Sequence, residues 1–86
     1  MEKEKDFTEE RNKGLDLAEK YKRERHYLTA RFWIGYADAY KQENKKENPE
    51  KWIAKAIELI GEFKEKKQKG DEYYWSGLKF GYEQRR

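Results

Sequence analysis

One segment of the chain recurs at a spacing of 42 residues. The sequence WIGYADAYKQ (33–42) aligns with WSGLKFGYEQ (75–84), with Trp, Gly, Tyr and Gln at matching positions. Over the full overlap, eight of the 44 aligned pairs are identical. A repeat of this length has room for two helices and the turn between them. The sequence therefore predicts two similar helical hairpins.

Composition favours helices around an aromatic core. The chain has no Val and one Pro but many Lys, Glu and Ala residues, which disfavours strands. Its aliphatic content is low and 45% of its residues are charged, as in many disordered chains. However, the net charge is only +3, and seven Tyr, four Phe and three Trp supply large side chains to bury. We therefore expect residues 1–86 to form one small helical domain.

Two motifs mark the ends of helices. In ENPEK, Asn48 can cap a helix that begins at Pro49. In KGDE, Gly70 can end that helix and Asp71 can cap the next one. The apolar residues between these motifs share one arc, as an amphipathic helix requires; they are Trp52, Ile53, Ala56, Ile57, Leu59, Ile60 and Phe63.

The boundary between the first two helices is less marked. Residues 8–46 contain no Pro and only two Gly, so local propensity permits one long helix. The 42-residue alignment instead places a turn at 26–29, with Thr29 as the cap of the second helix. We predict an all-α fold, a small antiparallel helical bundle of four helices in two similar hairpins, spanning about 8–25, 29–46, 49–69 and 71–85. The alternative is one long first helix plus two shorter helices, in a dimer.

Three pairs of small residues lie four positions apart, so each pair shares one helix face. The pairs are Gly14/Ala18, Gly35/Ala39 and Gly77/Gly81. Such a face lets two backbones approach closely, which offsets the cost of about 1 kcal/mol that a mid-helix Gly carries relative to Ala. We expect helix contacts at these faces; a ligand or peptide lying across them is the alternative.

Two helices carry more apolar surface than one packed side needs. The helix at 29–46 is apolar nearly all round, which indicates that it is surrounded by protein and favours self-association, such as a homodimer, or another protein partner. In the last helix, Tyr73 and Phe80 lie on one edge of a wide apolar arc, and Trp75 and Tyr82 lie on the other. Aromatic residues and Arg are enriched in protein interfaces. The predicted partner-binding residues are Tyr73, Trp75, Phe80, Tyr82, Arg85 and Arg31.

Nucleic-acid binding is an alternative function. A basic cluster combines phosphate-binding cations with rings that can stack on bases; its residues are Lys22, Arg23, Arg25, His26 and Tyr27. The C-terminal tail, with Lys79, Arg85 and Arg86, is a second candidate. Glu residues interrupt both clusters and the total charge is modest, whereas dedicated binders carry a cleaner basic stripe.

The sequence carries no cofactor or metal motif. It has no Cys, which excludes disulfides and thiolate metal sites, and His26 is its only histidine. No apolar run is long enough to span a membrane, and the charged start lacks the apolar stretch of a secretion signal. We therefore expect a cytoplasmic protein with no cofactor, no metal and no membrane partner. The Lys/Glu-rich composition is also typical of proteins from hot environments and of many mesophilic helical proteins.

Two families offer partial resemblances. The segments NPEKWIAKAIELIGEF and KGDEYY resemble parts of tetratricopeptide hairpins, which implies a peptide-binding scaffold. A long helix followed by two shorter ones is similar in outline to small helical chorismate mutases, whose dianionic substrate is held by Arg and Lys. Arg11 matches such a role, whereas Leu28 and Ala39 stand where further cations are needed.

These observations favour a non-enzymatic helical binding module. We expect it to act through protein–protein contacts, as an adaptor, inhibitor or assembly subunit, with aromatic anchors and a basic rim. A small helical enzyme of chorismate-mutase-like outline is the minor alternative.

Overall fold

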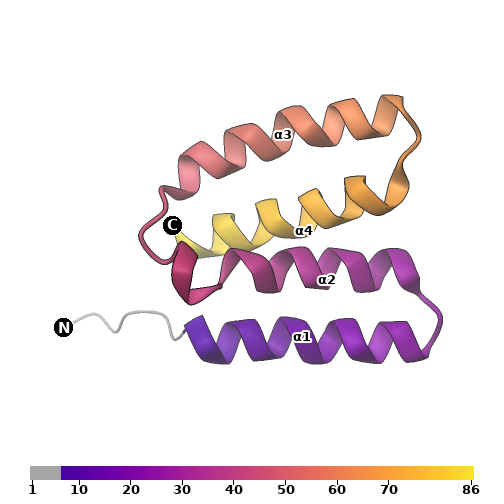
Figure 1. The fold of residues 1–86 in the computed structure, drawn as a ribbon, viewed down its shortest axis with the longest axis horizontal. Helices are drawn as coiled ribbons and strands as arrows, with labels where there is room; N and C mark the ends of the chain where they lie inside the picture. The colour runs from indigo at the N-terminus through magenta and orange to yellow at the C-terminus, as the bar shows by residue number, and fades with distance from the viewer. Residues whose placement is uncertain (1–6) are drawn as a thin grey trace.

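The computed structural model describes residues 7–86, which form four α-helices (Figure 1). Their bounds are α1 Phe7–Arg23, α2 Tyr27–Ala39, α3 Pro49–Glu65 and α4 Lys69–Arg85, with a short 3-10 helix, η1 Gln42–Asn44, between α2 and α3. The prediction of a small all-α bundle is therefore confirmed. The alternative with one long first helix is wrong, because the chain turns after Arg23.

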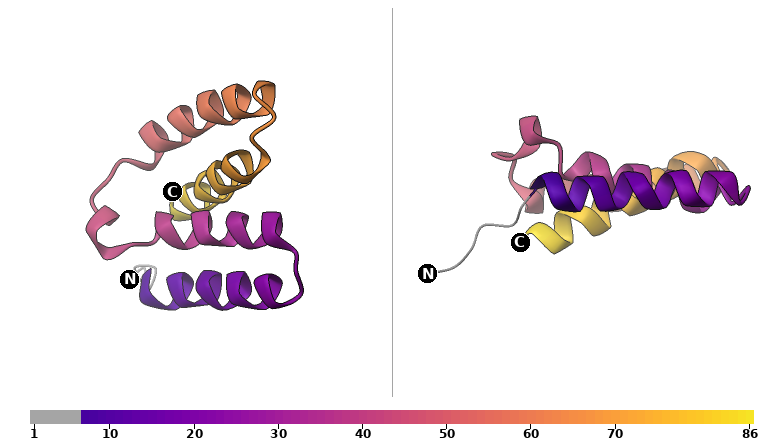
Figure 2. Two further views of the ribbon diagram at one scale, coloured as in Figure 1. Left: turned by 45° about the vertical axis from the view of Figure 1, so that its right-hand side comes forward. Right: turned by 90° about the horizontal axis from the view of Figure 1, so that it is seen from below.

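The helices lie side by side in the order α1, α2, α4, α3 (Figures 1 and 2). Within each hairpin the two helices are antiparallel. The two hairpins meet through α2 and α4, which run parallel to each other because each begins at the same end of the molecule. The principal extents of 44 × 30 × 18 Å reflect this flat arrangement.

The start of α3 forms as its sequence predicts. The Asn48 side chain accepts a hydrogen bond of 3.0 Å from the backbone N–H of Glu50, and Pro49 takes the first helical position. The expected roles of Gly70 and Asp71 are wrong, because both lie within the first turn of α4, which begins after Gln68.

The two hairpin turns have the same backbone structure. In the first turn, the N–H of His26 donates to the carbonyl of Tyr21 at 2.8 Å; in the second, the N–H of Gln68 donates to the carbonyl of Phe63 at 2.9 Å. The two donors are 42 positions apart in the sequence, and so are the two acceptors. The preceding residues, Arg25 (φ 63°) and Lys67 (φ 57°), are both left-handed, also 42 positions apart. Both turns are therefore Schellman motifs in which a cation occupies the position that favours Gly.

Replacing Arg25 and Lys67 with Gly is expected to stabilise the protein. A left-handed conformation is unfavourable for residues with a Cβ, whereas Gly adopts it without a steric penalty and loses only unfolded-chain entropy. Each substitution should raise the free energy of unfolding by about 0.5–1 kcal/mol. Urea unfolding measures the change, and a loss of stability in both variants would contradict the turn geometry.

The first turn and the end of α2 differ from their predicted positions. The turn lies at residues 24–26 rather than 26–29, so Thr29 is inside α2 and His26 occupies the N-cap position without a side-chain capping bond. The helix predicted at 29–46 ends at Ala39. At this end the backbone N–H groups of Tyr40 and Lys41 donate to the carbonyls of Ala37 and Asp38 at 3.0 and 3.2 Å, so the last turn tightens. Side chains then satisfy the last carbonyls, because Asn44 donates to Asp38 at 3.0 Å and Arg85 donates to Ala39 at 2.9 Å.

Two glycines set the distance between the hairpins. A Cβ built on Gly35 would lie 2.0 Å from the carbonyl oxygen of Tyr74, and one built on Gly77 would lie 1.7 Å from that of Phe32. Both distances are far inside van der Waals contact, so only Gly permits this approach of the backbones. Gly81, paired with Gly77, also meets α2, because a Cβ there would lie 2.6 Å from the Cβ of Ala39. The remaining pair, Gly14/Ala18, is buried as well, and a Cβ on Gly14 would lie 3.2 Å from the Cβ of Ala37.

The α2–α4 interface has approximate two-fold symmetry. Gly35 and Gly77 are 42 positions apart, as are the residues they contact, Phe32 and Tyr74. The same relation links Tyr40 and Tyr82, the two largest fully buried side chains. A 42-residue shift therefore exchanges the two hairpins, as the repeat predicts. The core cluster comprises Tyr36, Ala39, Tyr40, Ile53, Leu78 and Tyr82.

Most of the apolar circumference of α2 is covered within the chain, while Tyr27 (60%) and Ile34 (36%) stay exposed. This helix lies between α1 and α4, and its buried residues are Ala30, Gly35, Tyr36, Ala37 and Ala39. Packing within the chain therefore accounts for most of the apolar pattern of α2, and self-association stays a prediction.

Candidate functional site

The structure decides which edge of α4 is covered. Tyr73 and Phe80 each keep 37% of their surface exposed, whereas Tyr82 keeps 2%. Trp75 is half-buried and packs against the core. The uncovered edge is therefore the one with Tyr73 and Phe80, and Tyr82 is not accessible to a partner in this conformation.

The side chain of Arg85 is engaged in contacts within the fold. Its guanidinium donates hydrogen bonds of 2.9–3.4 Å to the backbone carbonyls of four residues, which are Ala39, Asn44, Lys45 and Glu47. It also lies over the rings of Phe7 (4.8 Å) and Tyr82 (4.7 Å). Arg85 therefore fastens the connection between the two hairpins, and its donors are not directed at solvent.

Arg31 joins the start of α4 to α2. It is exposed, and it donates to the carbonyl of Gly70 at 3.3 Å and to the carboxylate of Asp71 at 3.2 Å. Its guanidinium also lies 5.5 Å from the centre of the Tyr74 ring. Arg31 remains accessible at the end of the molecule that carries both turns.

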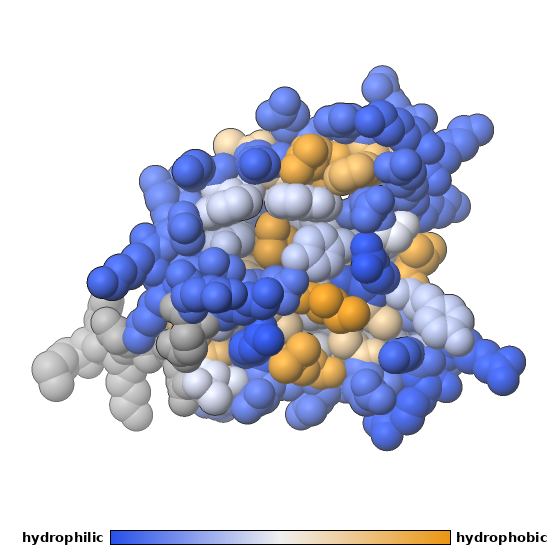
Figure 3. Space-filling view, in the orientation of Figure 1, coloured by the Kyte–Doolittle hydropathy of each residue, from blue (hydrophilic) through white to orange (hydrophobic). Residues whose placement is uncertain are grey.

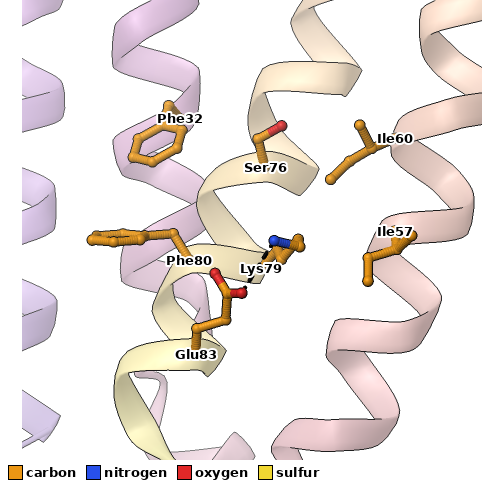
Figure 4. A pocket seen from close by; sticks show the side chains of 7 residues that line it. All are labelled: Phe32, Ile57, Ile60, Ser76, Lys79, Phe80 and Glu83. Atoms are coloured by element: carbon orange, nitrogen blue, oxygen red, sulfur yellow. Dashed lines mark hydrogen bonds and ion pairs between the residues drawn. The ribbon is translucent and has the colours of Figure 1, made fainter.

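An apolar groove of about 440 Å³ lies on the Phe80 edge (Figure 4). Phe32 and Phe80 line one side, and Ile57 and Ile60 from α3 line the other. The remaining lining residues are Ser76, Lys79 and Glu83. Ile57 is 57% exposed, which is high for an aliphatic side chain beside other apolar groups.

The groove is held in shape by ring packing and an ion pair. The Phe80 ring contacts those of Phe32 and Tyr36, at centroid distances of 5.9 and 5.6 Å. The Lys79 ammonium lies 3.1 Å from the Glu83 carboxylate, one turn along α4. Because these residues are already ordered by their neighbours, a ligand in the groove would cause little further loss of side-chain entropy on binding.

The equivalent place on the first hairpin differs chemically. There Leu15 and Ile34 correspond to Ile57 and Ser76, and they are 39% and 36% exposed. Asp38 stands at the position of Phe80, and its carboxylate accepts a hydrogen bond from the Tyr74 hydroxyl. Figure 3 shows apolar side chains gathered over the α1–α2 hairpin on the face seen in Figure 1. The equivalent place on the first hairpin therefore has Asp38 instead of the Phe80 ring that lines the groove.

The sequence pattern identified Phe80 but missed three other groove residues, Phe32, Ile57 and Ile60. Ile57 is at the flank of the apolar arc of α3, so the arc alone assigned it to the core. The exposure of Ile57 could have been predicted from the pairing of α3 with α4. When two paired helices have apolar arcs of different widths, the edge of the wider arc stays uncovered. Phe32 could not be placed without knowing that α2 and α4 are parallel.

The predicted nucleic-acid residues lie together at the first turn. Lys22 and Arg23 end α1, Arg25 and His26 form the turn, and Tyr27 begins α2 with 60% of its surface exposed. All five are exposed. The C-terminal cations are at the opposite end, where Arg85 is engaged as above and Arg86 pairs with Glu50 at 2.7 Å.

Four tyrosines have hydroxyls whose pKa is raised above the usual value near 10, chiefly by burial; they are Tyr36, Tyr40, Tyr74 and Tyr82. Tyr36 also donates to Glu10 at 2.5 Å and Tyr74 to Asp38, which holds both in the neutral form. In the unfolded chain they ionise near pH 10.

Stability is therefore expected to be lost in alkali. The pKa of these tyrosine hydroxyls is higher in the folded protein than in the unfolded chain. The free energy of unfolding is therefore unchanged below about pH 10 and falls above it, because there only the unfolded chain releases the hydroxyl protons. Each tyrosine contributes a slope of up to about 1.4 kcal/mol per pH unit. Urea unfolding across this range measures the slope, and Tyr36→Phe should make it shallower. A pH-independent midpoint would contradict the buried tyrosines.

Residues 7–86 offer neither a metal centre nor a membrane span. In this part of the chain, no group of three or more His, Cys, Asp or Glu side chains is arranged to hold a metal ion. No described helix combines the length and apolar character needed to cross a membrane.

Arg11, the residue matched to chorismate mutases, faces the protein. It donates to the carbonyl of Ala37 at 3.1 Å and lies 3.9 Å from the Asp38 carboxylate. The long first helix on which that resemblance depended is not present.

Comparison with known proteins adds no relative. No protein-family model, no curated protein and no solved structure matches the chain.

Proposed function

We propose that the protein is a non-enzymatic helical binding module that holds an amphipathic helix of another protein in the α3–α4 groove. The observation that carries this proposal is the apolar lining of the groove, in which Ile57 keeps 57% and Phe80 keeps 37% of its surface exposed. Grooves between two helices commonly accept the apolar face of a third helix, whose anchors recur every three or four residues.

The chemistry of the groove supports a helical partner. Phe32, Phe80, Ile57 and Ile60 offer apolar walls along antiparallel helices, a direction that a third helix can follow. The Lys79–Glu83 pair offers one cation and one anion at the rim, so charged residues beside the partner's apolar stripe can fix its register. Of the predicted anchors, Phe80 lines the groove, whereas Tyr82 and Arg85 are engaged in the fold.

Site-specific photo-cross-linking tests the proposal while the partner is unidentified. A photoreactive residue replaces Ile57 in the full chain, expressed in the cells that make the protein. A matched variant carries it at Glu58, the exposed neighbour on the outer face of α3. We expect one protein to be cross-linked from position 57 and not from position 58.

A second substitution makes the assay specific for the groove. In the Ile57 cross-linking variant, Ser76→Lys adds charge to the groove lining, and it should abolish the adduct without unfolding the protein because Ser76 is not fully buried. Identical adducts from positions 57 and 58 would refute the groove as the binding surface. If the chain were cross-linked only to a second copy of itself, the groove would be a self-association surface and not a site for another protein.

A further inference from the structure

Both hairpin turns lie at one end of the molecule, and both are basic. Residues 20–27 and 64–70 together contain eight Lys or Arg and two Glu, a net charge of +6. The whole chain carries only +3, so the remaining residues sum to −3. Figure 1 shows the α1–α2 and α3–α4 connections at the same end. We name residues 20–27 and 64–70 the basic end.

The pseudo-symmetry of the hairpins brings these cations together. The eight basic residues are all exposed; they are Lys20, Lys22, Arg23, Arg25, Lys64, Lys66, Lys67 and Lys69. At this end, Arg31 of α2 bonds to Gly70 and Asp71 in the first turn of α4. The second turn therefore adds four lysines to the four cations of the first turn; one of these lysines, Lys66, pairs with Glu62 at 3.0 Å.

Aromatic rings lie among these cations. Tyr27 is 60% exposed and Tyr73, from the first turns of α4, is 37% exposed. Both line a recess of about 410 Å³ at the first turn, with Arg25 and His26 beside them. Cations beside stacking-capable rings are the combination that single-stranded nucleic acids require, because phosphates pair with the cations and bases stack on the rings.

The backbone supplies a separate reason to assign a role to this end. Arg25 and Lys67 both occupy left-handed positions, where Gly would be more favourable. Two equivalent turns therefore each keep a cation at a cost in stability. Residues kept in unfavourable conformations cluster at functional sites.

From this arrangement we propose that the basic end binds single-stranded nucleic acid. The two turns contact phosphates, and Tyr27 and Tyr73 stack on bases beside the recess. The surface is separate from the α3–α4 groove, so this site and the proposed protein partner can fail or succeed independently.

The decisive variant removes charge while improving the fold. Arg25→Gly with Lys67→Gly lowers the charge of the basic end by two and is expected to stabilise both turns. Its matched control, Lys46→Gln with Lys51→Gln, removes two exposed cations from the opposite end. The probe is a labelled oligothymidylate single strand, titrated into the full chain at several salt concentrations.

Binding of this probe should weaken as salt rises. The Gly pair should lower affinity on the order of tenfold and reduce the slope of log affinity against log salt by about 1.4, which is about 0.7 for each lost phosphate contact. The control pair should change affinity less than about twofold. Absence of binding at low salt, or equal losses in the two variants, would overturn the proposal.

A second variant separates base stacking from plain charge attraction. Tyr27→Ala should weaken oligothymidylate binding by roughly fivefold or more and leave inorganic polyphosphate binding unchanged. Equal losses for both probes would refute recognition of bases. Tighter binding to phosphatidylserine vesicles than to the oligonucleotide would assign the basic end to membranes instead.

Discussion

Replacing Gly77 with Ala is expected to destabilise the fold by at least about 3 kcal/mol. The new methyl group would stand 1.7 Å from the carbonyl oxygen of Phe32, and that oxygen belongs to the backbone of α2. No rotamer change can relieve the contact, so the two hairpins must separate along the whole interface. Urea unfolding followed by circular dichroism measures the loss, and Gly35→Ala should act similarly because its Cβ meets backbone at 2.0 Å.

Gly61 provides the matched control for this prediction. It is also within a helix, but a Cβ there would meet nothing within 4 Å. Gly61→Ala should therefore raise stability by about 0.5–1 kcal/mol through helix propensity alone. If Gly77→Ala were as stable as Gly61→Ala, the close approach of α2 and α4 would be wrong.

Replacing Arg85 with Ala is expected to cost about 2–4 kcal/mol of stability. The guanidinium stacks against the rings of Phe7 and Tyr82. It also donates hydrogen bonds to four backbone carbonyls where the chain passes from one hairpin to the other, those of Ala39, Asn44, Lys45 and Glu47. Removing the side chain takes this donor from several backbone acceptors beside a buried aromatic cluster.

Two further substitutions test whether the planar guanidinium of Arg85, and not only its charge, stabilises the fold. Arg85→Lys keeps the charge but loses the planar fork, so most of the stability should still be lost. Arg86→Ala, which removes only an exposed ion pair with Glu50, should leave the unfolding midpoint close to that of the parent chain. Equal midpoints for Arg85→Ala and Arg86→Ala would show that the side chain does not hold the inter-hairpin connection.

The repeat in the sequence predicted most of the fold. Trp33, Gly35 and Tyr40 recur as Trp75, Gly77 and Tyr82 at equivalent positions of the two hairpins. The glycines let two backbones approach at one interface, and the tyrosines fill equivalent positions beside it. Because the two hairpins place the same residue types at equivalent positions, the repeat can be recognised in a single sequence.

Other features could not be read from local sequence. The turn at 24–26 carries Arg25 where a Gly would have marked it, so the break was predicted too late in the chain. The carbonyl of Ala39 at the end of α2 accepts a hydrogen bond from Arg85, which is distant in sequence. The exposed edge of α4 depends on the parallel packing of α2 and α4, since Tyr82 and Phe80 have similar chemistry but opposite burial. The last two features involve tertiary contacts, whereas the turn is a local Schellman motif that lacks the usual Gly.

The fold separates two candidate surfaces. The groove beside Phe80 lies along the second hairpin, and the basic end lies where the two turns meet. Both follow from one relation, the parallel contact of α2 with α4, which exposes one edge of α4 and aligns the turns. The two surfaces therefore depend on this contact.

Nuclear Overhauser effects from the α-protons of Gly35 and Gly77 test that contact most directly. We predict strong cross-peaks from Gly77 to Phe32 and from Gly35 to Tyr74 and Leu78, because these residues adjoin at the interface. They should appear in the monomer and persist on dilution. Absence of cross-peaks between residues 27–39 and 69–85, or their loss on dilution, would contradict the parallel contact of α2 with α4 within one chain.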